Sequence, residues 1–123
     1  NGGAAIGIKL ADPTKTIVNL TGDGSYLFSV PASVHWMSRR YQAPFLTVIY
    51  NNEGWNATKQ NLLKRYPDGI AKQTDRYWVN FDQSADLAKI AEAAGGAYAR
   101  MVTDPRELPE VLQQAMNEVK NGK

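Results

Sequence analysis

Short apolar segments alternate with longer amphipathic ones along this chain of 123 residues. Residues 16–21 and 45–50 are apolar and rich in β-branched or aromatic side chains, and turn residues bound both segments. This pattern is typical of strands that are covered on both faces. Residues 97–102 have the same character in a weaker form and predict a third strand.

Helical spacing of apolar residues predicts amphipathic helices between and after these strands. Pro31 suits the first turn of the first helix, because its missing N–H costs nothing there. Gly95 and Gly96 end the second helix, and Asp104 and Pro105 suit the start of the third. Each predicted helix carries an apolar stripe on one face. The stripes are Val30, Val34, Met37 and Tyr41; Leu87, Ile90, Ala91 and Ala94; and Leu108, Val111, Leu112, Ala115, Met116 and Val119.

The order of these elements predicts an α/β domain, a three-layer sandwich with a mainly parallel sheet between helices. We expect helix, strand, helix, strand, helix, helix, strand and helix along the chain. No linker or repeat divides the sequence, and its length fits one domain over residues 1–123. In parallel sheets ligands bind beyond the carboxyl ends of the strands, so the residues after each strand are the candidates for chemistry.

Two polar loops follow the two clearest strands. The first reads GDGS over residues 22–25, and the second reads NNEG over residues 51–54. Because parallel strands point the same way, both loops leave the same edge of the sheet. Asp23 offers a carboxylate oxygen, Asn52 a carboxamide oxygen and Gly54 a backbone carbonyl. Hard oxygen ligands of this kind suit Mg²⁺.

The same loops offer hydrogen-bond donors for a phosphate group. Gly22 and Gly24 allow backbone N–H groups to approach phosphate oxygens closely, and Ser25 adds a hydroxyl. Either loop alone is more often an ordinary turn than a binding site. Their combination favours a cradle for Mg²⁺ and diphosphate, because each follows a buried type of strand and the interval fits one helix and one strand.

Composition and charge exclude several other classes of protein. Hydrophobic residues make up 43% and charged residues 21%, which excludes a disordered, collagen-like or coiled-coil chain. The chain has no cysteine and one histidine, which excludes thiolate and histidine-rich metal sites and is compatible with the cytoplasm or an organellar matrix. A net charge of +2 is too small for a strong nucleic-acid footprint. No apolar run has the length that a membrane span requires.

The sequence GDGSYLFSVPASVHWMSRRYQAPFLTVIYNNEGW at residues 22–55 resembles the thiamine-diphosphate-binding motif of thiamine-dependent enzymes. It is most similar to the carboxy-terminal domain of the group that contains acetolactate synthase, pyruvate decarboxylase and benzoylformate decarboxylase. The preceding GAAIGIKLADPTKTIV is similar to the helix and strand that lead into this motif. The second half of the chain agrees with the group only in its order of elements.

The resemblance implies a thiamine-diphosphate-binding fold and assigns roles to the two loops. Asp23 and Asn52 would bind Mg²⁺ through their side chains, and Gly54 through its carbonyl. Gly24 and Ser25 would contact the diphosphate of the cofactor. The substrate would be a 2-keto acid. The reaction would be a simple decarboxylation, a carboligation to an acetohydroxy acid or a 2-hydroxyacyl cleavage.

The residues around the second loop are open to more than one interpretation. Trp55, Asn56 and Lys59 could line a substrate pocket, as the matching segment does in the family, or Trp55 could only pack this segment onto the sheet. Glu53 could strengthen the field at the cation, but a solvent-facing acid is the favoured interpretation. Asn51 is expected to brace the loop.

Several other residues could have a functional role, but a structural interpretation is favoured for them. His35 could act as a general base, although a surface or partly packed position is favoured. Arg39 and Arg40 are typical of a solvated helix face. Residues 64–80 are rich in charge, glycine and proline, with aromatic residues between, and predict a long loop. This loop could be ordered by the cofactor or by another domain, or its aromatic residues could contact another subunit.

The resemblance also implies that parts of the enzyme lie elsewhere. In the family, a glutamate that activates the cofactor comes from a separate amino-terminal domain, usually of a partner subunit, in a dimer or tetramer. Further family elements would lie before Asn1 and after Lys123. We therefore expect a fragment, truncated at both ends, that does not turn over substrate by itself.

Two further hypotheses compete with a thiamine-dependent enzyme. The first is an assembly module of the same fold that has lost cofactor binding, and the presence of Asp23, Ser25 and Asn52 argues against it. The second is a dinucleotide-binding domain, which the missing G-x-G-x-x-G spacing disfavours.

Overall fold

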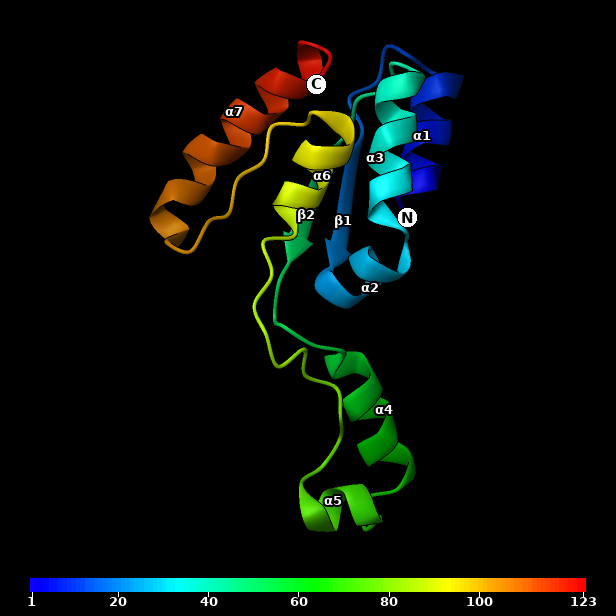
Figure 1. Ribbon diagram of the computed structural model, residues 1–123, viewed down its shortest axis with the longest axis vertical. Coiled ribbons are helices and arrows are strands. Elements are labelled where there is room, and N and C mark those ends of the chain that lie inside the picture. Colours follow the sequence, from blue (N-terminus) through cyan, green and yellow to red (C-terminus); the bar gives the residue numbers. More distant parts are fainter.

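The computed structural model describes all 123 residues, and the chain folds into short helices around a pair of parallel strands (Figure 1). The elements are α1 (Gly2–Ala11), β1 (Val18–Gly22), α2 (Asp23–Phe28), α3 (Pro31–Arg40), β2 (Leu46–Tyr50), α4 (Asn56–Arg65), α5 (Ile70–Thr74), α6 (Ala88–Gly95), the 3₁₀ helix η1 (Pro105–Glu107) and α7 (Leu108–Lys120). No helix has both the length and the apolar composition that a membrane crossing requires.

The two predicted strands are confirmed, and they pair side by side in parallel. Val18 lies opposite Leu46, and Gly22 lies opposite Tyr50 at the carboxyl end of both strands. The strands are connected through α2 and α3, as a parallel pair requires. Because both strands end at the same level, the loops that follow them start from neighbouring positions.

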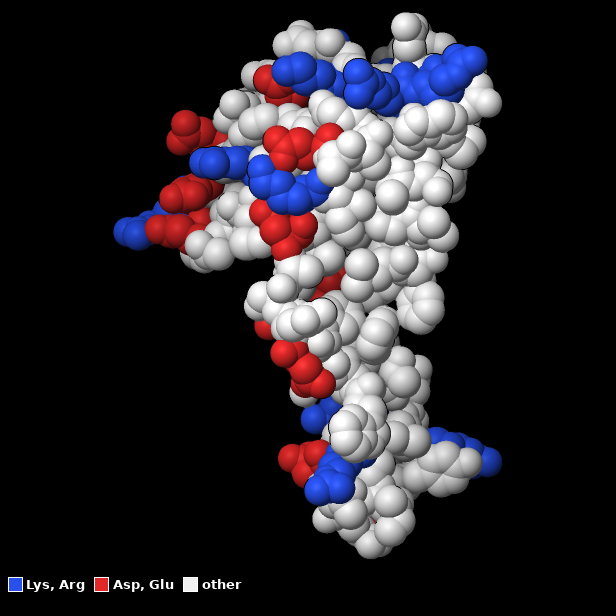
Figure 2. Space-filling model, viewed as in Figure 1, with Lys and Arg blue, Asp and Glu red and all other residues white.

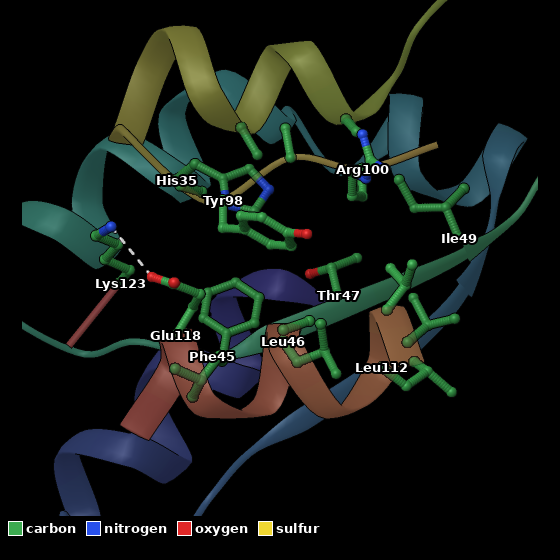
Figure 3. Close-up of a pocket in the computed structure, with 18 of the residues that line it drawn as sticks. His35, Phe45, Leu46, Thr47, Ile49, Tyr98, Arg100, Leu112, Glu118 and Lys123 are labelled. Atoms are coloured by element: carbon green, nitrogen blue, oxygen red, sulfur yellow. Dashed lines mark ion pairs between the residues drawn. The ribbon is translucent and has the colours of Figure 1, made fainter. Parts of the chain in front are cut away.

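The predicted third strand is wrong. Residues 97–102 are extended but belong to no sheet, and the sheet has two strands. A cavity of about 1030 Å³ separates this segment from β2 and α7, so its backbone does not reach a strand partner. In Figure 3, Tyr98 points across this space toward Thr47, while β2 runs between α6 and α7. The α/β class with parallel strands is confirmed, but the sheet is smaller than predicted.

The core lies where α1 and α3 meet the start of β2. It consists of buried side chains from α1 and from the segment entering β2, with two partly buried residues packed against them. These residues are Ala5, Ile6, Ala43 and Phe45, with Ile17 and Val34 around them. Burial of such aliphatic and aromatic groups supplies the main driving force for docking α1 and α3 on the sheet.

The buried face of α3 differs from the predicted stripe. Val30, Met37 and Tyr41 are exposed, whereas Pro31 and His35 are buried. The reason is that α6 packs closely on α3: a Cβ atom at Gly95 would lie 2.7 Å from the His35 carbonyl oxygen. The surface of α3 that meets α6 is therefore rotated toward His35. Arg39 and Arg40 are exposed, as expected.

The interpretation of residues 64–80 as one long loop is partly wrong. The end of α4 and the whole of α5 lie in this stretch, and α4 and α5 project away from the sheet (Figure 1). Trp78 in the same stretch is 83% exposed. Two predicted helix boundaries are confirmed. The helix α6 ends at Gly95, before Gly96 with its left-handed backbone, and Asp104 caps η1 by accepting the Arg106 N–H.

Glycine in the middle of α1 offers a test of the local helix energetics. Gly7 is exposed, and a Cβ atom at this position would meet nothing within 4 Å. We expect Gly7→Ala to raise the free energy of unfolding by about 1 kcal/mol, because alanine loses less backbone entropy in a helix. Urea unfolding measures the change. Gly2→Ala should not gain stability in the same way, since its Cβ atom would lie 2.5 Å from the Val34 side chain.

Candidate functional site

The two predicted loops meet at the carboxylate of Asp23. This side chain is 2% exposed and lies at the first position of α2, directly after β1. Its Oδ1 atom accepts the Gly24 N–H at 2.7 Å. Its Oδ2 atom accepts the N–H groups of Asn52 and Gly54, each at 3.1 Å. One buried carboxylate thus joins the loop after β1 to the loop after β2.

The Asp23 carboxylate has no cationic side chain as a partner. None of the four ion pairs of the chain involves it. Around α2 and the lower ends of the strands, the face drawn in Figure 2 shows acidic and uncharged groups but no lysine or arginine. Buried carboxylates are normally paired or bind a metal. With three N–H donors on about four lone-pair positions, this carboxylate can still accept a cation.

The donors around Asp23 fit a hard cation. The Asn52 side chain is exposed at the loop, and Gly54 is buried beside the carboxylate. No cluster of three or more histidine, cysteine, aspartate or glutamate side chains exists, so a cation here would take its oxygens from one carboxylate, an amide, the backbone, water and a ligand. This is the mixed ligand set that Mg²⁺ uses with phosphates. The residues therefore fit Mg²⁺.

The second loop is held in shape by its own side chains. The Asn51 Oδ1 atom accepts the Glu53 N–H at 3.1 Å, so Asn51 braces the loop as expected. Glu53 has a left-handed backbone with φ of 57° and an exposed side chain, in agreement with a solvent-facing acid. This turn directs the Gly54 N–H back toward Asp23.

Residues 79–84, for which the sequence predicts no role, hold the second loop through hydrogen bonds. The Trp55 N–H donates to the Val79 carbonyl at 2.8 Å, and the Phe81 N–H donates to the Glu53 carbonyl at 3.0 Å. The Ser84 hydroxyl donates to Glu53 Oε1 at 2.6 Å. Residues 79–84 carry no recognisable motif, and only the folded chain brings them next to the loop. These hydrogen bonds fix the position of Gly54 relative to Asp23.

Trp55 packs over the first loop. The centre of its ring lies 4.6 Å from the centre of the Phe81 ring, in an edge-to-face contact, and 5.9 Å from the centre of the Phe28 ring. A Cβ atom at Gly24 would lie 2.4 Å from Trp55 Cδ1, so glycine is required there by the indole. At Gly22 the corresponding space is open, and Ser25 is exposed. Trp55 therefore packs between the first loop, Phe28 and Phe81, at a position that also borders the predicted diphosphate cradle.

The two polar residues after Trp55 point elsewhere. Asn56 begins α4 and is exposed. The Lys59 ammonium lies 4.4 Å from the centre of the Tyr77 ring, in a cation–π contact within the projecting part of the chain. Neither residue lines the large cavity beside β2, and that cavity also lies apart from Asp23, which is not among its lining residues.

His35 is more buried than expected. It stacks on Phe45 with ring centres 5.7 Å apart, and its Nε2 atom lies 3.1 Å from the Tyr26 hydroxyl. Burial lowers the pKa of His35 from its ordinary value of 6.5 and raises the pKa of Tyr26 to about 12. Both groups therefore favour their neutral forms, and the pair connects α3 to α2, the helix that begins with Asp23.

The buried histidine predicts a pH-dependent stability. Because the folded-state pKa of His35 is depressed, its contribution is fully present above about pH 6.5 and is lost as the pH falls toward the folded-state value. We expect the urea midpoint to fall between pH 7 and about pH 5. His35→Phe should flatten this slope, since the chain has one histidine. An equal slope in both proteins would contradict the prediction.

Comparison with known proteins agrees with the geometry. Residues 1–122 match the family model of the thiamine pyrophosphate enzyme C-terminal TPP-binding domain. The chain belongs to this family. It is 33% identical to acetolactate synthase of Bacillus subtilis over 113 residues, and 31% identical to the acetolactate synthase isozyme 3 large subunit of Escherichia coli over 121 residues. These matches cover 92% and 98% of the chain but 18% and 19% of the relatives.

A solved structure supports the fold of this thiamine pyrophosphate-binding domain. The thiamine diphosphate-dependent 4-hydroxybenzoylformate decarboxylase of Rhodococcus jostii RHA1 superposes with a TM-score of 0.64 at 21% sequence identity. The match covers 96% of the chain and 20% of the decarboxylase. The chain therefore spans about a fifth of the length of the proteins it resembles.

Proposed function

We propose that this domain binds Mg²⁺ and thiamine diphosphate in an enzyme that processes 2-keto acids, either an acetolactate synthase-like carboligase or a decarboxylase. The observation that carries the proposal is the meeting of two loops at Asp23, a buried carboxylate without a cationic partner. Membership of the thiamine pyrophosphate family supports the choice of cofactor. The names of the acetolactate synthases support the choice of reaction class.

The residues of the two loops divide the work of binding. Asp23 and Asn52 hold the cation through side-chain oxygens, and Gly54 holds it through its carbonyl. A cation held there would supply the positive charge that the surface around α2 lacks and would balance the charge of the diphosphate. The diphosphate is bordered by Gly22, Gly24, Ser25 and Trp55.

Thiamine diphosphate, when bound, serves as the electron sink for the carbanion formed from a 2-keto acid. The contribution of this chain is to anchor and orient the cofactor, and we assign no catalytic residue to it. The glutamate that activates the cofactor is proposed to lie in another domain, with the complete enzyme working as a homodimer or homotetramer.

A non-catalytic assembly module of the same fold is the alternative. Such a module would have no need of a buried carboxylate without an opposite charge at the strand ends, because burying a charge is costly unless it is paired or binds a metal. The presence of Asp23, Ser25 and Asn52 in the two loops favours cofactor binding.

Titration of the complete protein with thiamine diphosphate, followed by calorimetry, tests the proposal. We expect binding that requires Mg²⁺ and that is abolished by a chelator such as EDTA. Absence of binding at millimolar cofactor with excess Mg²⁺, in a protein that is folded and assembled, would favour the assembly module instead.

A further inference from the structure

The indole N–H of Trp55 is a buried donor without a partner. Its Nε1 atom has no accessible surface of note and no hydrogen bond in the structure. Buried donors are almost always paired, with protein or with a bound molecule, so an unpaired one requires an explanation. Only one other side-chain atom of the chain shares this condition, the Thr47 hydroxyl in the sheet.

The unpaired N–H lies at the predicted diphosphate cradle. A Cβ atom at Gly24 would be 2.6 Å from Trp55 Nε1 and 2.4 Å from Cδ1, so the polar edge of the ring faces this glycine. Phe28 and Phe81 contact the rest of the ring and hold its orientation. The indole is therefore fixed with its one polar atom at the loop that carries Gly24 and Ser25.

The neighbouring polar groups do not provide an acceptor for this N–H. The Asp23 carboxylate, which is the nearest charged group along the loop, already accepts three backbone N–H groups. An oxygen of a ligand that lies on Gly24 would meet the indole edge. A phosphate oxygen is a suitable acceptor, because it is charged and accepts several donors at once.

We propose that the Trp55 indole N–H donates a hydrogen bond to an oxygen of the bound diphosphate. The inference rests on the proposed function, since it requires a diphosphate on the first loop. It gives Trp55 a binding role in addition to its packing on Phe28 and Phe81. This hydrogen bond is one that phenylalanine, which has no ring N–H, could not make at the same position.

The experiment measures the affinity of Mg²⁺-pyrophosphate by calorimetry in the complete protein and in three variants. Trp55→Phe keeps an aromatic ring but loses the N–H. Replacement of Trp55 by 3-benzothienylalanine, in which sulfur stands for the ring N–H, keeps the size and stacking of the indole. Thr47→Val removes the other unpaired buried donor and is the matched control.

We expect both Trp55 variants to bind Mg²⁺-pyrophosphate about tenfold more weakly, in line with the loss of one hydrogen bond to a charged group. Thr47→Val should bind with unchanged affinity. Subtracting the fluorescence spectrum of Trp55→Phe from that of the wild type isolates the emission of Trp55. We expect this difference spectrum to change when Mg²⁺-pyrophosphate is added.

Equal affinity of the benzothienylalanine variant and the wild type would overturn the inference and leave the proposed function intact. This variant keeps the test decisive even where Trp55→Phe disturbs the packing. If the folded wild type does not bind Mg²⁺-pyrophosphate or thiamine diphosphate, the proposed function fails and the inference fails with it.

Discussion

Replacement of Asp23 by alanine is expected to weaken the Mg²⁺-dependent binding of thiamine diphosphate by about a hundredfold or more. Loss of a residue that merely supports a metal ligand lowers affinity about 10- to 100-fold, and Asp23 is proposed to be a ligand itself. The variant also leaves the N–H groups of Gly24, Asn52 and Gly54 without their acceptor. Calorimetric titration at saturating Mg²⁺ measures the change.

Two controls separate the cation from the fold. Asp23→Asn keeps an acceptor oxygen but removes the charge, so it should retain more stability than Asp23→Ala while still losing most of the affinity. Asp68→Ala removes an exposed acid between α4 and α5 and should bind as the wild type does. Wild-type affinity in Asp23→Ala would contradict the assignment of this carboxylate to the cation.

Gly54→Ala is expected to destabilise the domain by about 1–3 kcal/mol and to weaken cofactor binding in parallel. A Cβ atom at this position would lie 2.7 Å from the Val79 carbonyl oxygen, which belongs to the backbone and cannot rotate away. Relief of this clash would separate the second loop from residues 79–81. The Gly54 N–H would then lose its position beside Asp23.

The matched variant is Gly22→Ala, measured by urea unfolding. Gly22 has φ of −82°, which alanine adopts readily, and its Cβ atom would meet nothing within 4 Å. We expect this variant to unfold at nearly the wild-type midpoint. Equal urea midpoints for Gly54→Ala and Gly22→Ala would contradict the prediction that the close contact with Val79 constrains the second loop.

The junction of the two loops was predictable from sequence. The strand segments show themselves by their apolar, β-branched composition, and the interval between them admits a helix and a parallel return. These two facts alone place the residues after each strand at one edge, and the structure confirms this through the hydrogen bonds from Asn52 and Gly54 to Asp23. The role of these residues in binding stays a prediction.

The errors have a common physical cause. The apolar pattern of residues 97–102 is typical of a strand, but pairing also requires a strand within hydrogen-bond distance, and a cavity intervenes. Likewise, the apolar stripe of α3 does not reveal that α6 docks beside His35. The contacts of residues 79–84 with the second loop join positions about 30 residues apart, as the separation of 31 between Ser84 and Glu53 shows. Local spacing carries no information about such contacts.

The most direct test of the account is anomalous diffraction from crystals of the complete protein grown with thiamine diphosphate and Mn²⁺ in place of Mg²⁺. We expect one Mn²⁺ peak within about 2.5 Å of an Asp23 carboxylate oxygen, Asn52 Oδ1 and the Gly54 carbonyl, with diphosphate oxygens completing the coordination. A diphosphate whose metal ion contacts none of these three residues would contradict it.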